Sequence, residues 1–494
     1  MCFLPCALAA CLGAASCKGD AAKALDRMIV GKASDGVVDA EDWKALTSML
    51  EKDMQAYSAF YEDGAISERE LRNYIKEKME NRRPPVEVVF KGIGKGSGMA
   101  VNFYLESSGS MPAYDSPRGD GSFKAAVVHM LNSLPGKTSK ADMFIVNSTV
   151  EKYPEGVGRF LKEADIFGAA KGYGDPSYTD FRGIFRSIAD KTGAGDISVL
   201  VTDMIYSTKD MDGVNPSKIF AEAEGMANTA FKESAAGKQT LVVKMDGSYN
   251  GPYYPYDSPS SGRRYDGRRP YYIMVIGGNT AMAALASGED YSAFADFRSL
   301  RGYQASHLFA TDKTYAPYYS VLLSNPDNMG TFRPVRGQGD RVVELRDAEP
   351  DKVAGKLRMA VAVDLGSMLV DNAYSADKAN YSVEADVPAS IREIRPINDK
   401  DATPAMKKYL GKATHIIVLE TSRVSKPERI SVKLLNRLPA WVAKSSTDDD
   451  TSFGPGFENT TFGLEHMMRG IQAAYSANGH GENRYFELEI KLDD

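Results

Sequence analysis

A run of strand-forming residues that stops at small hydroxyl residues is the feature that most constrains this fold. Residues 100–105 read Ala-Val-Asn-Phe-Tyr-Leu, and Glu106-Ser107-Ser108-Gly109-Ser110 follows them directly. A short apolar run bounded by a turn signal is typical of a strand that is buried on both faces of a parallel sheet. The run therefore predicts a central strand that presents a polar loop at its carboxyl end.

Two later segments carry polar residues that would complete a site with this loop. Thr179 precedes an amphipathic helical pattern, and residues 197–203 form a second apolar run that ends at Thr202 and Asp203. Loops at the carboxyl ends of strands in an open α/β sheet converge on one crevice. We therefore expect the three segments to meet there, with oxygen ligands that suit Mg²⁺, Mn²⁺ or Ca²⁺.

The order of strand-like and helical patterns predicts three regions. Residues 18–85 are helical in pattern, and strands then alternate with helices over residues 86–310, which favours an α/β fold with a doubly wound, mainly parallel sheet. Over residues 311–494, short strand-like runs separated by turn signals predict a β-rich, sandwich-like domain. A helix at 462–475 and a strand at 485–492 are expected to close the chain.

The order of the three polar segments resembles the von Willebrand factor type A domain and its metal-ion-dependent adhesion site. The positions that match the family's metal ligands are Ser108, Ser110, Thr179 and Asp203. Glu106 stands where the family has aspartate. Glutamate is one methylene longer, and Mg²⁺ requires near-octahedral geometry at about 2.0–2.1 Å. The resemblance implies a Mg²⁺ site that Glu106 also reaches, or else a fold that has lost its metal.

Charge and cysteine usage exclude several other chemistries. The net charge is −6, and acidic and basic residues are interspersed, so nucleic acid is not an expected partner. The four cysteines are Cys2, Cys6, Cys11 and Cys17. The rest of the chain therefore has no cysteine for a disulfide, a Cys₄ zinc site or a thiol nucleophile.

The first 17 residues are typical of a signal peptide of a bacterial lipoprotein. They are apolar and end in small residues, and two tetrapeptides, at 8–11 and at 14–17, resemble a lipobox. We expect lipid attachment at Cys17, because polar residues follow it immediately; an unprocessed start is the alternative. A lipid would anchor the protein in the bacterial cell envelope, at the outer membrane or cell surface, without a membrane-spanning segment.

An insertion rich in tyrosine and arginine, residues 247–272, separates two strand-like runs. Tyrosine offers a large contact area at low entropic cost, and arginine stacks on rings and binds anions, so the insertion could bind a glycan, a peptide or an acidic partner. Its prolines and glycines equally suit an ordered surface hairpin without a ligand.

No recognised catalytic motif is present. The five histidines lack metal-ligand spacing, and the chain has no Gly-x-Ser-x-Gly, P-loop or His-Glu-x-x-His sequence. The leading hypothesis is therefore a lipid-anchored binding or assembly protein that holds a protein, an acidic extracellular ligand or a glycan through its variant adhesion site. The alternatives are a hydrolase of extracellular glycans, since paired carboxylates need only spatial proximity, and a metal-free scaffold.

Overall fold

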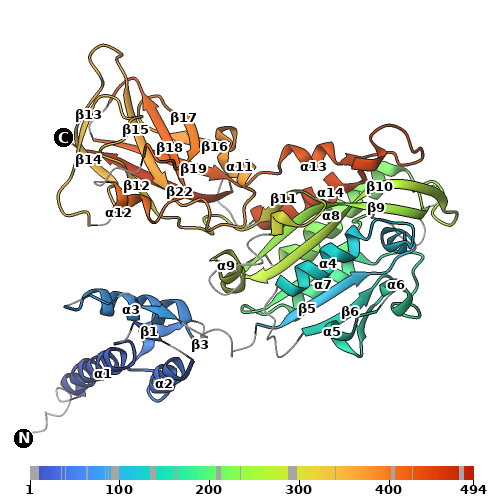
Figure 1. Ribbon diagram of the computed structural model, residues 1–494, viewed down its shortest axis with the longest axis horizontal. Coiled ribbons are helices and arrows are strands. Elements are labelled where there is room, and N and C mark those ends of the chain that lie inside the picture. Colours follow the sequence, from blue (N-terminus) through green and yellow to red (C-terminus); the bar gives the residue numbers. More distant parts are fainter. Residues whose placement is uncertain are drawn as a thin grey trace, which may run out of the picture. The chain divides into compact units, whose positions relative to one another are not determined.

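A computed structural model shows that the chain forms two compact units, Met1–Gly98 and Met99–Asp494. We describe each unit by itself (Figure 1). The structure describes residues 10–34, 36–38, 40–62, 65–83, 85–86, 88–90, 99–133, 141–160, 162–163, 165–206, 213–233, 235–287, 297–339, 341–401, 406–424, 427–477 and 483–493.

The first unit consists mainly of helices around a small core. Its elements are α1 (Ala10–Lys32), β1 (Val37–Val38), α2 (Ala40–Glu51), η1 (Ser58–Phe60), β2 (Tyr61–Glu62), β3 (Ala65–Ile66), α3 (Glu68–Glu80) and β4 (Val89–Phe90). The side chain of Ser67 accepts the Glu70 backbone N–H at 3.5 Å, as its sequence position before a helix predicts. Strand β4 pairs with β1 and so belongs to this unit. The proposed signal segment up to residue 9, and the side chain of Cys17, lie outside the described part.

The second unit is built on a large mixed sheet. Within the described residues this sheet has seven strands, in the order β11-β9-β10-β8-β5-β6-β7. The strands are β5 (Val101–Glu106), β6 (Ala141–Val146), β7 (Val150–Tyr153), β8 (Ile197–Thr202), β9 (Lys238–Tyr253), β10 (Arg263–Gly278) and β11 (Tyr303–Phe309). The fold is therefore mixed α/β, and every residue of β5 and β8 is buried, as the apolar runs predict.

The prediction of a mainly parallel sheet is wrong. Only the pairs β5–β6 and β5–β8 are parallel, and the other pairings of this sheet are antiparallel. Strand β9 follows helix α8 (Pro216–Lys232) but does not pair with β8. The neighbour of β8 is β10, the second strand of the β9–β10 hairpin. A strand covered on both faces has the same continuous apolar pattern in either direction, so the sequence does not distinguish the two arrangements.

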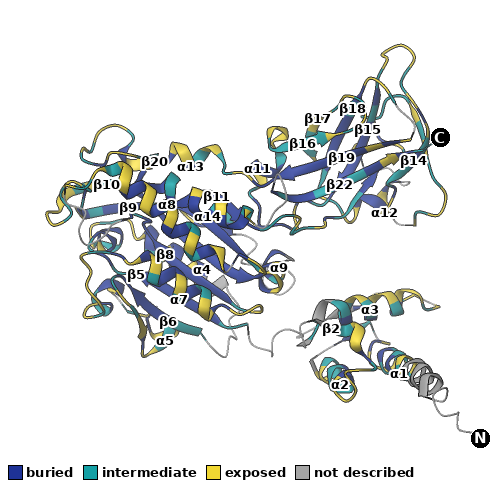
Figure 2. Cartoon of the chain, turned by 180° about the vertical axis from the view of Figure 1, so that it is seen from behind, coloured by how far each residue is buried: buried dark blue, intermediate teal, exposed yellow. Residues whose placement is uncertain are grey.

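Helices cover both faces of this sheet, and its strands are correspondingly buried (Figure 2). One face packs against α7 (Phe181–Lys191), α8 and α14 (Leu464–Ser476). The other face packs against α4 (Ser122–Ser133), α9 (Asn279–Ser287) and the short helix η2 (Met111–Asp115). Two smaller helices, α5 (Gly156–Phe160) and α6 (Ile166–Ala169), follow β7.

Helix α14 comes from the far end of the chain and packs closely against α8 (Figure 1). A Cβ atom at Gly470 would lie only 2.3 Å from the carbonyl oxygen of Glu224, so the contact requires glycine at this position. Helix α13 (Ala440–Lys444) and the short pair β20 (Ser446–Thr447) and β21 (Thr461–Phe462) precede α14. The chain thus returns to the large sheet after residue 438, although the sequence predicts one β-rich region from 311 to the end.

Two smaller sheets form the β-rich part of the unit and contribute to one hydrophobic core. The first has the order β12-β15-β18-β17: β12 (Tyr319–Val321), β15 (Leu357–Val363), β18 (His415–Thr421) and β17 (Ala389–Pro396). The second has the order β13-β14-β22-β19-β16: β13 (Thr331–Pro334), β14 (Glu344–Glu349), β22 (Arg484–Leu492), β19 (Glu428–Leu435) and β16 (Tyr381–Glu384). Short helices α11 (Asn372–Ala376) and α12 (Lys407–Leu410) connect strands of these sheets.

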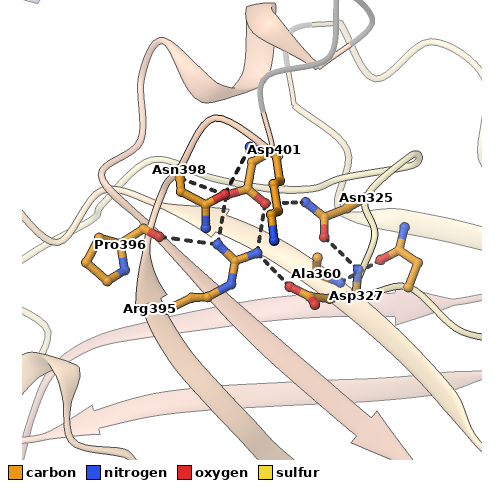
Figure 3. Close-up of polar contacts among 9 residues, drawn as sticks. Asn325, Asp327, Ala360, Arg395, Pro396, Asn398 and Asp401 are labelled. Carbon is orange, nitrogen blue, oxygen red and sulfur yellow. Dashed lines mark hydrogen bonds and ion pairs between the residues drawn. The ribbon is translucent and has the colours of Figure 1, made fainter.

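A buried carboxylate ties the loops at one end of the β-rich part together (Figure 3). The guanidinium of Arg395 donates two hydrogen bonds of 2.7 Å to Asp401 and one of 2.6 Å to Asp327. Asp401 is fully buried and also accepts the Asn325 side-chain amide and the Asn398 backbone N–H, each at 2.9 Å. The hydrogen bonds from Arg395 lower the pKa of Asp401 to about 2. This bidentate pair therefore joins the loop after β12 to the turn after β17.

Replacing Asp401 by asparagine should lower the free energy of unfolding of the β-rich part by roughly 2 kcal/mol, because Arg395 would lose its bidentate partner while staying largely buried. Urea denaturation of the full chain checks this. Asp399→Asn is the matched control, since Asp399 is an exposed carboxylate in the same turn. An equal loss of stability in both variants would contradict the role given to Asp401.

Candidate functional site

The parallel pairing of β5 with β8 brings two carboxylates together at one edge of the large sheet. Leu105 of β5 pairs with Val201 of β8, so Glu106 and Asp203 follow on adjacent strands. Both side chains are only 1% exposed. Burying two acidic side chains this close is costly unless hydrogen bonds or a cation compensate their charge.

Thr179 reaches the same place from the start of α7. Asp180 caps this helix by accepting the Gly183 backbone N–H at 3.1 Å, and its own N–H donates to the carbonyl oxygen of Asn147 at 2.9 Å. Because Asp180 makes the capping hydrogen bonds, the side chain of Thr179 is not needed for the cap and points toward β5. Its hydroxyl donates a hydrogen bond of 2.5 Å to Glu106 Oε1.

Hydroxyl groups satisfy both carboxylates. The second oxygen of Glu106, Oε2, accepts a short hydrogen bond from the Thr202 hydroxyl. Asp203 Oδ2 accepts the Ser110 hydroxyl at 2.6 Å, and the oxygens of Ser110 and Ser108 lie 3.3 Å apart. A donating hydroxyl oxygen keeps lone pairs that can accept a further partner, although one of those on Thr202 accepts the Met204 backbone N–H.

The turn after β8 fixes the direction of Asp203. The Ile205 backbone N–H donates to Asp203 Oδ1 at 3.1 Å, and the Met204 N–H donates to the Thr202 hydroxyl oxygen at 2.9 Å. Met204 has a φ of 56°, a left-handed conformation that a non-glycine residue rarely adopts. Local backbone strain of this kind clusters at functional sites.

The electrostatics of the site favour a bound positive charge. Burial, followed by repulsion from Asp203, raises the pKa of Glu106 to about 8, although the hydroxyl hydrogen bonds oppose the shift. Burial also raises the pKa of Asp203, against the hydrogen bond from Ser110. Arg269 lowers the pKa of Asp203 through space, but its guanidinium donates to the carbonyl oxygen of Phe457 and lies over the Phe457 ring. Among the described residues, the cation that acts on this pair is Arg269, and it does so through space on Asp203 without an ion pair.

The structure brings together every residue that the sequence placed at this site, namely Glu106, Ser108, Ser110, Thr179 and Asp203. Thr202 belongs to the site as well, and the sequence analysis did not select it as a ligand. Its position at the end of the second apolar run was the available signal. No group of three or more His, Cys, Asp or Glu side chains that could hold a metal occurs in the described residues. The ligand set here consists instead of two carboxylates and several hydroxyls.

The insertion at 247–272 is mostly strand rather than loop. It forms the outer halves of β9 and β10, which extend past the sheet as an ordered hairpin, as one of the two interpretations of the sequence expected; whether it binds a ligand is not tested by this pairing. All four of its arginines donate hydrogen bonds to protein acceptors: Arg263 to Asp257, Arg264 to Asn250, Arg268 to Asp246, and Arg269 to Phe457. These arginines therefore stabilise the hairpin itself.

Comparisons with protein-family models, with curated proteins and with solved structures found no significant match to this chain. No described helix is both long enough and apolar enough to cross a membrane. The chemistry of the site therefore has to be inferred from its own geometry.

In a chelating buffer, the free energy of unfolding should fall as the pH rises from about 6.5 to about 8, which lies above the range where the lowered pKa of buried His307 gives the opposite slope. The raised pKa of Glu106 means that the folded chain holds a proton that the unfolded chain releases. The contribution of Glu106 to stability is therefore fully present below its unfolded pKa of about 4.3, and it is lost as the pH rises through its folded pKa. The slope is at most about 1.4 kcal/mol per pH unit. Urea denaturation at a series of pH values measures it.

Glu106→Gln should flatten this pH dependence, because the amide stays neutral at every pH in the series. The matched control is Glu222→Gln, which alters a half-exposed carboxylate on α8 and should keep the wild-type slope. A wild-type slope in the Glu106 variant would contradict the assignment of the buried proton to Glu106.

Proposed function

We propose that this protein is a binding or assembly protein of the bacterial cell envelope that holds a partner through a cation at the Glu106–Asp203 site. One observation carries the proposal: three segments far apart in the sequence bring Ser108, Ser110, Thr179 and Asp203 to one edge of the sheet. The von Willebrand factor type A domain is the family whose ligand order these residues follow. A partner protein with an exposed acidic side chain is the ligand that suits such a site.

The residues fit a small divalent cation. Their donor atoms are all oxygens, which Mg²⁺ prefers and Mn²⁺ or Ca²⁺ accept. Two carboxylates buried without a paired cation would be neutralised by one, and the hydroxyls of Ser110 and Thr179 keep lone pairs for it. A cation held by these residues would supply a positive charge to which a carboxylate of the partner could bind. Glu106 contributes its negative charge through the hydroxyls of Thr179 and Thr202, which donate hydrogen bonds to its two carboxylate oxygens.

The attachment to the envelope rests on the sequence alone. Lipid on Cys17 would hold the protein at a membrane surface through acyl chains, as the signal-like first 17 residues suggest. Mass spectrometry of the processed N-terminus tests this part independently of the binding site.

The geometry gives little support to the alternative of a glycan hydrolase. A catalytic acid must reach the glycosidic oxygen, and the partner carboxylate must approach the sugar ring. Glu106 is buried, and both of its oxygens accept threonine hydroxyls. The burial of this carboxylate pair therefore favours the proposal of a bound cation over contact with a sugar.

Isothermal titration of the full chain with Mg²⁺ tests the proposal. Asp203→Ala and Ser110→Ala should each weaken Mg²⁺ binding by at least about tenfold, since each removes a coordinating oxygen or its orientation. Asp190→Asn, an exposed carboxylate at the far end of α7, should leave the affinity unchanged. Pull-down of a partner by the wild type should require the cation and fail in chelator.

The variant Glu106→Asp distinguishes a Mg²⁺ site that glutamate weakens from a chain that has lost its Mg²⁺ site. Tighter Mg²⁺ binding in this variant would mean that glutamate weakens a site that still exists. An absence of Mg²⁺ binding in both the wild type and the variant would overturn the proposal and favour a metal-free scaffold.

A further inference from the structure

The outer half of the β9–β10 hairpin packs directly on the elements that carry the candidate site. A Cβ at Gly251 of β9 would lie 2.7 Å from the Cβ of Ala113 in η2, so the two backbones approach closely. The hydroxyl of Tyr114, also in η2, donates to the carbonyl oxygen of Pro270 in β10 at 2.5 Å. Because η2 directly follows Ser110, both arms of the hairpin are fixed relative to the site loop.

The loop between the hairpin arms is anchored on its other side by the segment before α14. Asp450 is fully buried and accepts the Tyr253 hydroxyl at 2.7 Å and the Tyr256 backbone N–H at 3.0 Å. The ring of Tyr256 stacks on Phe462, with 5.0 Å between centroids. Tyr254, one of the two residues between these anchors, is therefore held in a defined place.

Tyr254 lies against the site loop itself. A Cβ at Gly109, the residue between Ser108 and Ser110, would lie 3.0 Å from Tyr254 Cε2 and 3.5 Å from its hydroxyl oxygen. On the other side, a Cβ at Gly262 would lie 3.0 Å from Tyr254 Cε1. The ring thus fits between two glycines, and a side chain at either position would push it away.

Three other tyrosines of the hairpin have different surroundings. Tyr249, Tyr253 and Tyr265 pack with one another or with Phe453 and Phe457, and their hydroxyls donate to protein oxygens. Tyr254 is half-buried, and within the described residues its hydroxyl has no hydrogen-bond partner. A free phenol group therefore lies beside the serine loop, at the partly exposed edge of the site.

We propose that Tyr254 is a specificity residue of the site, whose hydroxyl donates a hydrogen bond to the carboxylate of an acidic side chain on a partner protein. This inference rests on the proposed function, because it assumes that the same carboxylate binds the cation held by Ser108 and Ser110. The cation takes one oxygen of the partner carboxylate and Tyr254 takes the other. Two fixed contacts favour a planar carboxylate over an amide or a hydroxyl, since only the carboxylate offers two negatively charged oxygens.

The test uses the full chain, Mg²⁺ and two capped pentapeptides that differ only at the central residue, aspartate or asparagine, in a glycine background. NMR titration of the Mg²⁺-loaded wild type should show binding of the aspartate peptide and much weaker binding of the asparagine peptide. Tyr254→Phe keeps the ring between the two glycines and removes only the hydroxyl. It should lower the affinity for the aspartate peptide by about tenfold, as expected for a lost hydrogen bond to a charged group, and leave the affinity for Mg²⁺ unchanged.

Tyr256→Phe is the matched control, because Tyr256 lies two residues away in the same hairpin and stacks on Phe462 instead of the site loop. It should bind both Mg²⁺ and the aspartate peptide like the wild type. Equal peptide affinity in Tyr254→Phe and the wild type, or no peptide binding by the Mg²⁺-loaded wild type, would overturn this inference alone. A wild type that binds no Mg²⁺ would overturn the proposed function beneath it.

Discussion

The arrangement of the candidate site depends on the parallel pairing of β5 with β8. These neighbouring strands run in the same direction and end at the same edge of the sheet. The side chains of Glu106 and Asp203 are therefore buried next to each other. Four hydroxyl side chains surround the pair and orient it, but hydroxyls carry no charge. The protein therefore holds two acidic groups in a place where water cannot screen their charge, so burial raises both pKa values and the pair binds a proton more readily than exposed carboxylates do.

The sequence predicted the parts of this site that depend on local patterns. The strands before Glu106 and Asp203 are short apolar runs that end abruptly, and Thr179-Asp180 is a recognisable start of a helix. The side chains at these ends had to converge once the two strands were neighbours. Thr202 was harder to assign, because a hydroxyl residue inside a strand pattern fits a sheet as well as a site.

The features that the sequence did not predict depend on which buried surfaces meet. An apolar strand shows that it is covered on both faces, but it does not show its neighbour or its direction, so the place of β10 beside β8 was not foreseen. The same holds for α14: its periodicity shows an apolar face, but not that this face packs on α8, more than two hundred residues earlier in the chain. A hairpin at 247–272 was one of the expectations, but its prolines and glycines are turn formers in most contexts, so the sequence did not show that β9 and β10 continue through most of this segment. Here the glycines allow close packing against η2.

The packing of α14 on α8 has a consequence for how the chain is made. During synthesis, the ribosome completes all strands of the large sheet by residue 309, yet the helix that covers part of one face is not made until residues 464–476. Every described strand of the β-rich part except β22 is synthesised in between. Part of an apolar face of the nascent sheet therefore stays exposed to solvent or to a chaperone until α14 is synthesised, about 150 residues later.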